Sequence, residues 1–312
     1  MARDEKIYIL GCGAIGLALA AFLANAGKNV VAVRTRPGNH HAGDAAITVD
    51  GPGATLRIPV ETTTLSNLRE LNGVAIITAK SHANEMLAPA LAQKAFAGPI
   101  VLLQNGIGIE APFIESRFQR IQRAILYVTC QLVAENNVKF RPVASSPIGV
   151  LKGSEEELEA CIEALATPGF PFHAERFIQK HIWKKTIINS VFNSICPLLR
   201  VDNGIFACDE NAARLAREIV EECVPLAAAH DQLFTTEELM EQILRISKNS
   251  DGVLISTYQD ILAGRETEIE FLNLALARLA SALNPPPNLA RTEFLGKLIA
   301  FMSASRMLIS KG

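Results

Sequence analysis

A glycine-rich turn near the beginning of the chain constrains its fold more than any other feature. The run Gly11-Cys12-Gly13-Ala14-Ile15-Gly16 follows a strand-like apolar segment, Lys6 to Leu10, and opens an apolar helical pattern that ends at Gly27. Between a strand and a helix, glycines in this order allow a tight turn, close approach of a phosphate to the backbone and close helix packing. The turn therefore predicts a dinucleotide-binding α/β fold in which residues 11–16 hold a pyrophosphate at the positive end of the helix.

The segments that follow alternate between strand and helix patterns. Strands are predicted at 30–34, 55–60, 73–78 and 100–103, with helices at 66–71 and 83–93 between them. This alternation is typical of a mostly parallel, doubly wound sheet with helices on both faces. Residues 124–133, 138–143 and 148–151 are predicted to add antiparallel strands, and Ser154 with Glu157 is a predicted capping box for a helix ending near Ala166.

Beyond about residue 176 the periodicity is almost entirely helical. The predicted helices span 178–200, 209–230, 235–247, 255–263, 266–283 and 288–310. We therefore predict two domains. Residues 1–176 would form a Rossmann-type α/β domain that binds the cofactor, and residues 177–312 an all-helical domain that binds the substrate and carries the catalytic residues.

Composition excludes several classes of function. Hydrophobic residues make up 49% of the 312 residues, and the formal net charge of −2 points neither to nucleic acid nor to an anionic membrane surface. The longest apolar stretch, Ile15 to Val33, is interrupted by Asn25 and Lys28, and the chain opens without the pattern of a secretion signal. We expect a cytoplasmic protein with no membrane span.

The cysteines and histidines show no metal-binding pattern. Six cysteines are scattered without a Cys-x-x-Cys pair, which predicts reduced, small core residues. The His40-His41 pair stands in a loop bounded by proline and glycine, with no other ligand types at metal spacing. No metal is predicted, and a redox role for Cys12 in the glycine turn is left open by the sequence.

The end of the second predicted strand indicates which dinucleotide is bound. NAD-binding folds usually place Asp or Glu here for the ribose 2′-hydroxyl, whereas this chain has Val33-Arg34-Thr35-Arg36 and no carboxylate before Asp44. Arginine grips a 2′-phosphate through paired charge-assisted hydrogen bonds, so Arg34 favours NADPH over NADH. The alternative, an exposed loop arginine, applies more readily to Arg36 than to Arg34.

Two polar residues follow neighbouring predicted strands. Lys80 comes after the strand 73–78, and Asn105 comes after the strand 100–103 and before Gly106. Ligands of doubly wound sheets bind beyond the carboxyl ends of the strands, so both side chains are candidates for the cofactor and substrate rim. Each could alternatively be a turn residue, since Asn-Gly is a common turn pair.

A stripe of polar side chains is predicted on the first helix of the second domain. Lys185, Asn189 and Asn193 are spaced four apart among Ile, Val and Phe residues. Each step of four turns about 40° around a helix, so they line one face over roughly 12 Å. An ammonium and two amides in apolar surroundings are costly to bury without a partner, and a small polar substrate is one such partner. The alternative, a solvated face, suits Lys184 better.

Further motifs complete a pattern that resembles one family. Three motifs follow the lysine helix in order: Asn203-Gly204, Ser256-Thr257-Tyr258-Gln259-Asp260 and Thr267-Glu268-Ile269-Glu270. By itself Glu268 would be read as a solvated carboxylate in the first turn of a helix. Together with the glycine turn, Arg34, Lys80, the Gln104-Asn105-Gly106 turn and the Lys185 helix, these motifs resemble the ketopantoate reductase (2-dehydropantoate 2-reductase) family along the whole chain.

The resemblance implies an enzyme and a role for each residue. It implies NADPH-dependent reduction of 2-dehydropantoate to (R)-pantoate, in pantothenate and coenzyme A biosynthesis. Lys185 would be the general acid, and Glu268 would support it or contact the cofactor. Lys80 would belong to the cofactor half, and Asn105 would face both cofactor and substrate. The remaining substrate-binding residues would be Asn189, Asn193, Asn203 and Ser256.

The chain departs from the family pattern in two places, which leaves the particular 2-oxo acid open. Asn273-Leu274 stands where the family often has Asn-Gly, and Ser194-Ile195-Cys196 replaces a commoner Pro-Leu-Thr run. The alternatives are a paralogous reductase of another 2-oxo acid, a β-hydroxyacid dehydrogenase, and a regulator that binds NADPH without chemistry. Asn193, Ser256 and Glu268 argue against the dehydrogenase, and a regulator has no reason to retain the stripe. The apolar helical domain is compatible with a homodimer.

Overall fold

The computed structural model describes residues 5–35 and 42–309. The chain divides into two compact units, Met1–Gln104 with Ile109–Ile178 and Asn105–Gly108 with Gln179–Gly312. The segment Asn105–Gly108 thus belongs to the second unit although the first unit surrounds it in sequence, which the sequence patterns did not predict. The main boundary, at Ile178, lies two residues after the predicted position.

The first unit is built on one mixed sheet. Its strands are β1 (Lys6–Leu10), β2 (Val30–Arg34), β3 (Gly43–Asp50), β4 (Thr55–Thr64), β5 (Gly73–Ile77), β6 (Ile100–Leu102), β7 (Ile121–Ala124), β8 (Val128–Ala134), β9 (Asn137–Pro142), β10 (Ser146–Lys152) and β11 (Phe172–Ala174). Among the described residues they form a single sheet in the order β11-β10-β7-β6-β5-β1-β2-β4-β3-β9-β8. The strands from β7 to β4 along this order are all parallel, and β3–β4, β7–β10 and β8–β9 pair antiparallel.

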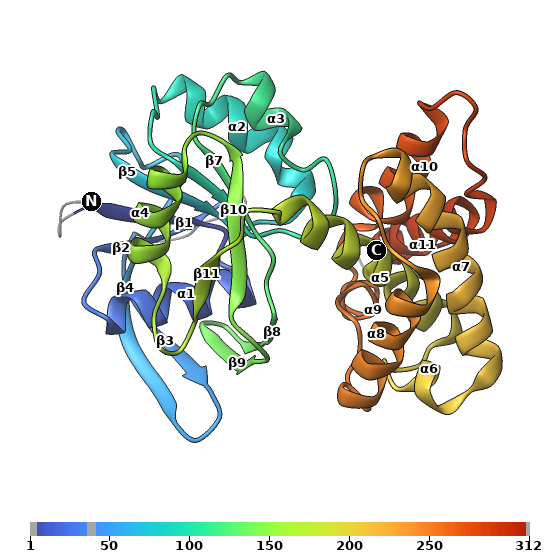
Figure 1. The fold of residues 1–312 in the computed structure, drawn as a ribbon. Helices are drawn as coiled ribbons and strands as arrows, with labels where there is room; N and C mark the ends of the chain where they lie inside the picture. Colours follow the sequence, from blue (N-terminus) through green and yellow to red (C-terminus); the bar gives the residue numbers. More distant parts are fainter. Residues whose placement is uncertain (1–4, 36–41, 310–312) are drawn as a thin grey trace. The chain divides into compact units, whose positions relative to one another are not determined.

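The central strands carry near-continuous apolar residues because helices cover both faces of the sheet. β1, β2 and β5 are buried along almost their whole length, as expected for parallel strands. The helices of this unit are α1 (Ala14–Asn25), the short 3₁₀ helix η1 (Ser81–Ala83), α2 (Asn84–Gln93), α3 (Ala111–Glu115) and α4 (Glu155–Leu165) (Figure 1). The predicted capping box of α4 is confirmed, since Ser154 and Glu157 exchange hydrogen bonds of 3.0 and 3.3 Å.

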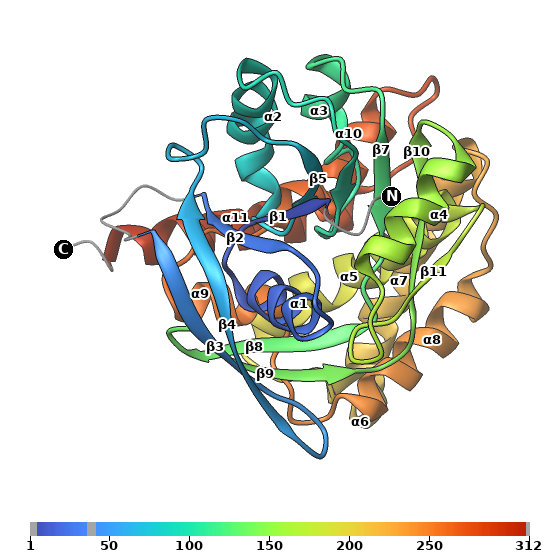
Figure 2. The ribbon, with the colours of Figure 1, turned by 90° about the vertical axis from the view of Figure 1, so that its left-hand side faces the viewer.

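Helix α1 is apolar on every side because the sheet curves around it. Its residues from Gly16 to Ala21 are all buried, and it packs on β1, β2, β3, β4, β8 and β9. Figure 2 shows α1 end-on, inside the curve formed by these strands. A helix enclosed in this way has no solvated face, which explains why its sequence shows no polar stripe. The curvature also brings the β8–β9 hairpin within reach of the end of β2.

The second unit is all-helical. Its elements are α5 (Ile178–Leu199), α6 (Ile205–Cys208), α7 (Glu210–Ala229), α8 (Thr236–Asn249), α9 (Ser256–Leu262), the 3₁₀ helix η2 (Ile269–Phe271), α10 (Asn273–Ser281) and α11 (Ala290–Ile309). One hydrophobic core joins α5, α7, α8 and α10, with Trp183 and Phe192 contributed by α5. In the part of the chain that the structure describes, no helix is both long and apolar enough to cross a membrane.

Three predictions of local structure were wrong. Residues 66–71 form no helix; a turn at 65–67 opens the segment, in which Thr64 bonds through its hydroxyl to Ser66 and through its carbonyl to the Asn67 N–H. The predicted strand 124–133 is two strands, β7 and β8, which lie at distant positions in the sheet. The predicted helix 266–283 breaks between η2 and α10, where the Phe271 carbonyl accepts the Ile107 N–H at 2.9 Å.

Candidate active site

The glycine turn contains three glycines. Packing within the protein requires glycine at Gly11 and Gly16 but not at Gly13. Gly11 has φ +127°, and a Cβ there would collide with the backbone of Ala79. A Cβ at Gly16 would collide with the Gly11 carbonyl, which accepts a 2.7 Å hydrogen bond from Thr78 Oγ1. Gly13 has φ −82°, and a Cβ there would meet no protein atom within 4 Å. Open space beside Gly13 is what a closely approaching ligand needs.

The turn also presents a helix N-terminus that no side chain caps. Gly13 is the N-cap residue of α1, and the first turn of α1 carries no acidic side chain. The leading N–H groups of such a helix carry a partial positive charge, so they attract an anion. The residues present therefore fit a dinucleotide pyrophosphate, which is the role predicted for residues 11–16.

Cys12 lies in this turn as a neutral thiol. Burial raises its pKa to about 11, and the nearby Arg34 guanidinium lowers the pKa by less. A thiol with this pKa is protonated near neutral pH and is a poor nucleophile. All six cysteines of the chain are free of disulfides.

Arg34 ends β2, and its guanidinium is held by the β8–β9 hairpin. Its Nη2 donates to Asn136 Oδ1 at 3.4 Å and lies 3.6 Å from Glu135 Oε1. The side chain is 21% exposed, so the charge is only partly shielded from a ligand. Arg36 and the His40-His41 pair lie outside the described residues.

A buried pair of amides, which sequence reasoning missed, fixes the chain beside Lys80 and Asn105. Gln104 Nε2 donates to Asn84 Oδ1 at 2.6 Å and to the Ala79 carbonyl at 2.8 Å. Asn84 Nδ2 donates in return to Gln104 Oε1 at 3.1 Å and to the Ile109 carbonyl at 2.8 Å. The sequence marks Gln104 only as part of a turn, and nothing in it signals that Asn84, twenty residues earlier, is its partner.

The predicted polar stripe lies on one helix, α5, as expected from its spacing. Lys185 and Asn189 are half-buried, whereas Asn193 is 2% exposed. Asn193 Nδ2 donates to the Asn189 carbonyl at 2.9 Å, and its Oδ1 lies 3.4 Å from both Ser256 Oγ and the Thr257 N–H. The fold therefore brings Asn193 and Ser256 together although they are 63 residues apart.

The neighbouring lysine has a different environment. Lys184 forms a 2.7 Å ion pair with Glu238 of α8. The ion pair ties α5 to α8. Lys185 lies on the side of α5 that carries Asn189 and Asn193.

Asn203 and Glu268 are both buried. The Asn203 N–H donates to the Val253 carbonyl at 3.0 Å, and its own carbonyl accepts from Ser247 Oγ at 2.6 Å. Its side-chain Oδ1 is buried without a hydrogen-bond partner among the described residues, an arrangement that a polar ligand would satisfy. Glu268 is 8% exposed and immediately precedes η2.

Asn105 stands at the start of the short segment that joins the second unit. A Cβ at the next residue, Gly106, whose φ is +103°, would press against Phe271. The segment therefore packs on η2, three residues beyond Glu268, and only glycine allows this contact. Asn273, the first residue of α10, donates from its Nδ2 to the carbonyls of Ser190 and Thr292 and so links α10 to α5 and α11.

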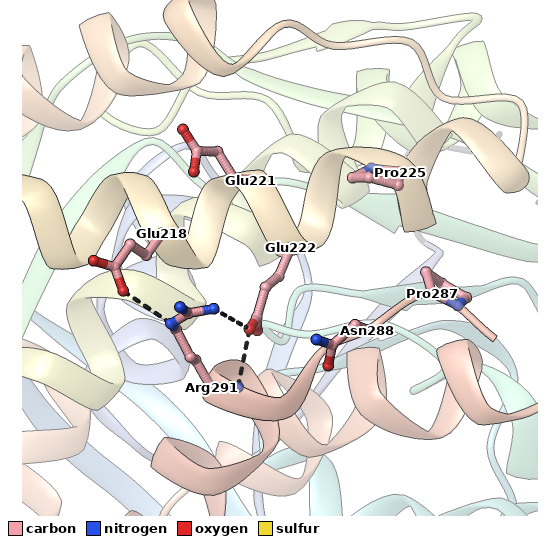
Figure 3. Close-up of a pocket in the computed structure, with 7 residues that line it drawn as sticks. All are labelled: Glu218, Glu221, Glu222, Pro225, Pro287, Asn288 and Arg291. Atoms are coloured by element: carbon pink, nitrogen blue, oxygen red, sulfur yellow. Dashed lines mark hydrogen bonds and ion pairs between the residues drawn. The ribbon is translucent and has the colours of Figure 1, made fainter.

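A pocket of about 340 Å³ lies elsewhere in the second unit and contains none of the predicted site residues. It is lined by Glu218, Glu221, Glu222, Pro225, Pro287, Asn288 and Arg291 (Figure 3). Glu222 and Glu218 are paired with Arg291, so these carboxylates serve the packing of α7 on α11. Among the described residues, no cluster of three or more His, Cys, Asp or Glu could hold a metal ion.

Comparison with known proteins places both units in one family. The model of the ketopantoate reductase PanE/ApbA family matches residues 7–152, and the model of its C-terminal region matches residues 177–302. A 2-dehydropantoate 2-reductase of Pyrococcus abyssi is 29% identical over 283 residues, covering 89% of this chain and 92% of the relative.

Two solved structures share the fold. The dimeric ketopantoate reductase of Staphylococcus aureus matches with a TM-score of 0.80 at 20% identity, over 96% of this chain and 99% of that one. A D-mandelate dehydrogenase with NADH and anilino(oxo)acetate matches with a TM-score of 0.83 at 21% identity, over the same 96% and 99%. The family models together span most of the chain, and on that ground it belongs to the ketopantoate reductase family of oxidoreductases.

Proposed function

We propose that this chain reduces the ketone of 2-dehydropantoate to the alcohol of (R)-pantoate, with NADPH as the reductant. The observation that carries the proposal is the α5 stripe, in which Lys185 and Asn189 share a helix face with an amide, Asn193, that is hydrogen-bonded to Ser256. Nothing in the packing of an ordinary helix calls for this combination. The relatives named 2-dehydropantoate 2-reductase support the substrate.

Lys185 is proposed to act at the ketone oxygen. When the nicotinamide is bound, it supplies a hydride to the ketone carbon, and negative charge then develops on that oxygen. An ammonium placed there stabilises the charge and delivers the proton that completes the alcohol. Glu268, buried before η2, is proposed to support the lysine or to contact the cofactor.

The amides and the serine are proposed to hold the rest of the substrate. Asn189, Asn203 and Ser256 offer donors and acceptors for the substrate's hydroxyl and carboxylate, and Asn105 would face both substrate and cofactor. Asn193 has both side-chain polar atoms engaged within the protein. Its contribution is therefore proposed to be the placement of Ser256, in addition to any substrate contact.

NADPH is proposed over NADH because of Arg34. The family uses a nicotinamide dinucleotide, and the glycine turn and the uncapped α1 N-terminus fit its pyrophosphate. Arg34, at the end of β2, is suited to a 2′-phosphate, and Lys80 is proposed to contribute to the same cofactor half. We expect NADPH to bind at least about tenfold more tightly than NADH, a difference of about 1.4 kcal/mol.

A cytoplasmic location and a homodimer complete the proposal. No membrane-crossing helix occurs among the described residues, and a dimeric relative shares the fold. Sedimentation of the purified protein would test the dimer.

The decisive experiment is a steady-state assay of NADPH oxidation with a panel of 2-oxo acids. The panel contains 2-dehydropantoate, pyruvate, a branched aliphatic 2-oxo acid and an aryl 2-oxo acid. The proposal expects kcat/KM to be highest for 2-dehydropantoate. A clearly higher kcat/KM for another 2-oxo acid would support the proposed reaction but would show that 2-dehydropantoate is not the preferred substrate. Tight NADPH binding without turnover of any 2-oxo acid would contradict the proposal and favour a regulator.

A further inference from the structure

Two adjacent residues of the β8–β9 hairpin contact the guanidinium of Arg34, and one is neutral while the other is negatively charged. Asn136 provides a neutral acceptor at 3.4 Å, and Glu135 provides a carboxylate at 3.6 Å from the same Nη2 atom. The hairpin is 102 residues from Arg34 in sequence and reaches it only because the sheet curves around α1. Glu135 is 82% exposed, so its carboxylate is open to solvent beside the Arg34 guanidinium.

The backbone of the hairpin turn is fixed, so the position of Asn136 is fixed with it. Glu135 and Asn136 are the two turn residues between the paired Ala134 and Asn137. Asn136 has φ +55°, a left-handed conformation that asparagine tolerates better than most residues. Its carbonyl accepts the Thr48 N–H of β3 at 2.8 Å, which ties the turn to the sheet.

We infer that Glu135 and Asn136 set how strongly Arg34 selects a 2′-phosphorylated dinucleotide, and that they act in opposite directions. This inference rests on the proposed role of Arg34. Asn136 orients the guanidinium without offsetting its charge, so it favours the phosphorylated cofactor. Glu135 offsets part of that charge and repels a phosphate, and a carboxylate in this region is an acceptor for a ribose 2′-hydroxyl. It therefore favours NADH.

The first test removes the charge of Glu135 and measures binding rather than turnover. In Glu135→Gln, the ratio of Kd for NADH to Kd for NADPH, from calorimetry, should rise by about two- to fivefold, the size expected for an exposed charge pair. The rise should shrink when salt is increased from about 0.05 to about 0.5 M, because screening weakens interactions between exposed charges. Glu159→Gln is the matched control, since Glu159 is an exposed glutamate on α4 of the same unit.

The second test removes the side chain of Asn136 and retains its backbone conformation. Glycine adopts positive φ without strain, so Asn136→Gly should fold normally, which circular dichroism would verify. The same Kd ratio should fall by about two- to fivefold, because the guanidinium loses one weak hydrogen bond that orients it.

Arg34→Ala separates failure of this inference from failure of the NADPH assignment. Unchanged NADPH affinity in Arg34→Ala would overturn the assignment and the inference together. A loss of about tenfold or more in Arg34→Ala, with Glu135→Gln behaving like Glu159→Gln, would overturn only the inference. Opposite shifts of the Kd ratio in Glu135→Gln and Asn136→Gly would establish it.

Discussion

At the scale of single residues, neighbours of the same type stand in different surroundings. Lys184 and Lys185 are adjacent on α5, yet Lys184 is paired with Glu238 at 2.7 Å, and Lys185 shares a face with Asn189 and Asn193. Gly13 and Gly16 belong to one motif, yet only Gly16 is required by protein packing. Residue type alone therefore does not predict what surrounds a side chain.

The two lysines provide a matched test of this difference. Lys185→Ala should lower kcat by about 10²-fold or more, since a general acid or oxyanion donor is lost, with little change in the Kd for NADPH. Lys184→Ala should leave kcat nearly unchanged and cost at most about 1 kcal/mol of stability, because its ion pair is partly exposed. Near-normal kcat in a folded Lys185→Ala protein would exclude the proposed role of this residue.

Cys12 should resist alkylation despite its place in the glycine turn. Its pKa is raised from 9.0 to about 11, so near pH 7.5 its thiolate fraction is lower by about a hundredfold than that of an ordinary thiol. The alkylation rate should therefore rise steadily with pH until the pH reaches about 11. Iodoacetamide labelling followed by peptide mass spectrometry measures this, with the exposed Cys208 as the internal comparison. Equal labelling of both cysteines near pH 7.5 would contradict a neutral Cys12.

At the scale of helices and strands, polar side chains join elements that the sequence separates. Asn193 connects α5 to α9, Asn273 connects α5 to α11, and the Asn84–Gln104 pair connects α2 to the end of β6. Buried amides can satisfy donors and acceptors on two elements at once, which fixes their relative positions more specifically than apolar packing does. Within each unit, such amides fix the elements that carry candidate site residues.

Glu222 of α7 performs the same function for the N-terminus of α11. Its carboxylate accepts the N–H groups of Arg291 and Thr292 at 3.0 and 2.9 Å and the Thr292 hydroxyl at 2.9 Å. It thereby satisfies leading donors of the helix and opposes its positive end.

Replacing Glu222 should therefore destabilise the protein. Glu222→Ala leaves the buried Thr292 N–H and hydroxyl without their acceptor, and we expect a loss of about 2–3 kcal/mol in the free energy of unfolding in urea. Glu221→Ala, at an exposed position of the same helix and pocket, should change the free energy by less than about 0.5 kcal/mol. If the two variants lost similar amounts of unfolding free energy, the hydrogen bonds from Glu222 to the N-terminus of α11 would not contribute measurably to stability.

At the scale of the whole molecule, two units have separate hydrophobic cores. One core surrounds α1 and the sheet, and the other joins α5, α7, α8 and α10. The chain's one tryptophan, Trp183, is 4% exposed in the second core, so its fluorescence reports the unfolding of the second unit. Circular dichroism reports helix and strand content in both units.

These two signals test the proposed contact of NADPH with Asn105 and Glu268, two residues of the second unit. NADPH at about one hundred times its Kd should stabilise the protein by about 2.7 kcal/mol. We expect it to raise the urea midpoint of the Trp183 transition as well as that of the circular dichroism transition. A shift confined to circular dichroism would mean that Asn105 and Glu268, which belong to the second unit, do not contribute to binding.

The sequence by itself determined those features that are encoded by local spacing. The glycine turn between β1 and α1, the strands from β1 to β6 apart from β3, the capping box of α4 and the α5 stripe were all predictable, because strand and helix periodicity and capping depend on near neighbours. The helical pattern of residues 66–71 was misleading, because a turn closed by the Asn67 N–H on the Thr64 carbonyl and by the Thr64–Ser66 hydroxyl pair replaces the helix. Family membership followed from the same motifs taken in order.

Only the tertiary structure decided which distant residues meet. Ser256 hydrogen-bonds to Asn193 across 63 residues of sequence, and Asn84 pairs with Gln104 across 20 residues. Asn136 of the β8–β9 hairpin accepts a hydrogen bond from Arg34 across 102 residues. Such contacts depend on strand order, on the curvature of the sheet around α1 and on helix packing, each of which results from burying apolar surface across the whole unit. No local pattern in the chain specifies them, because the hydrophobic effect depends on area and has no direction.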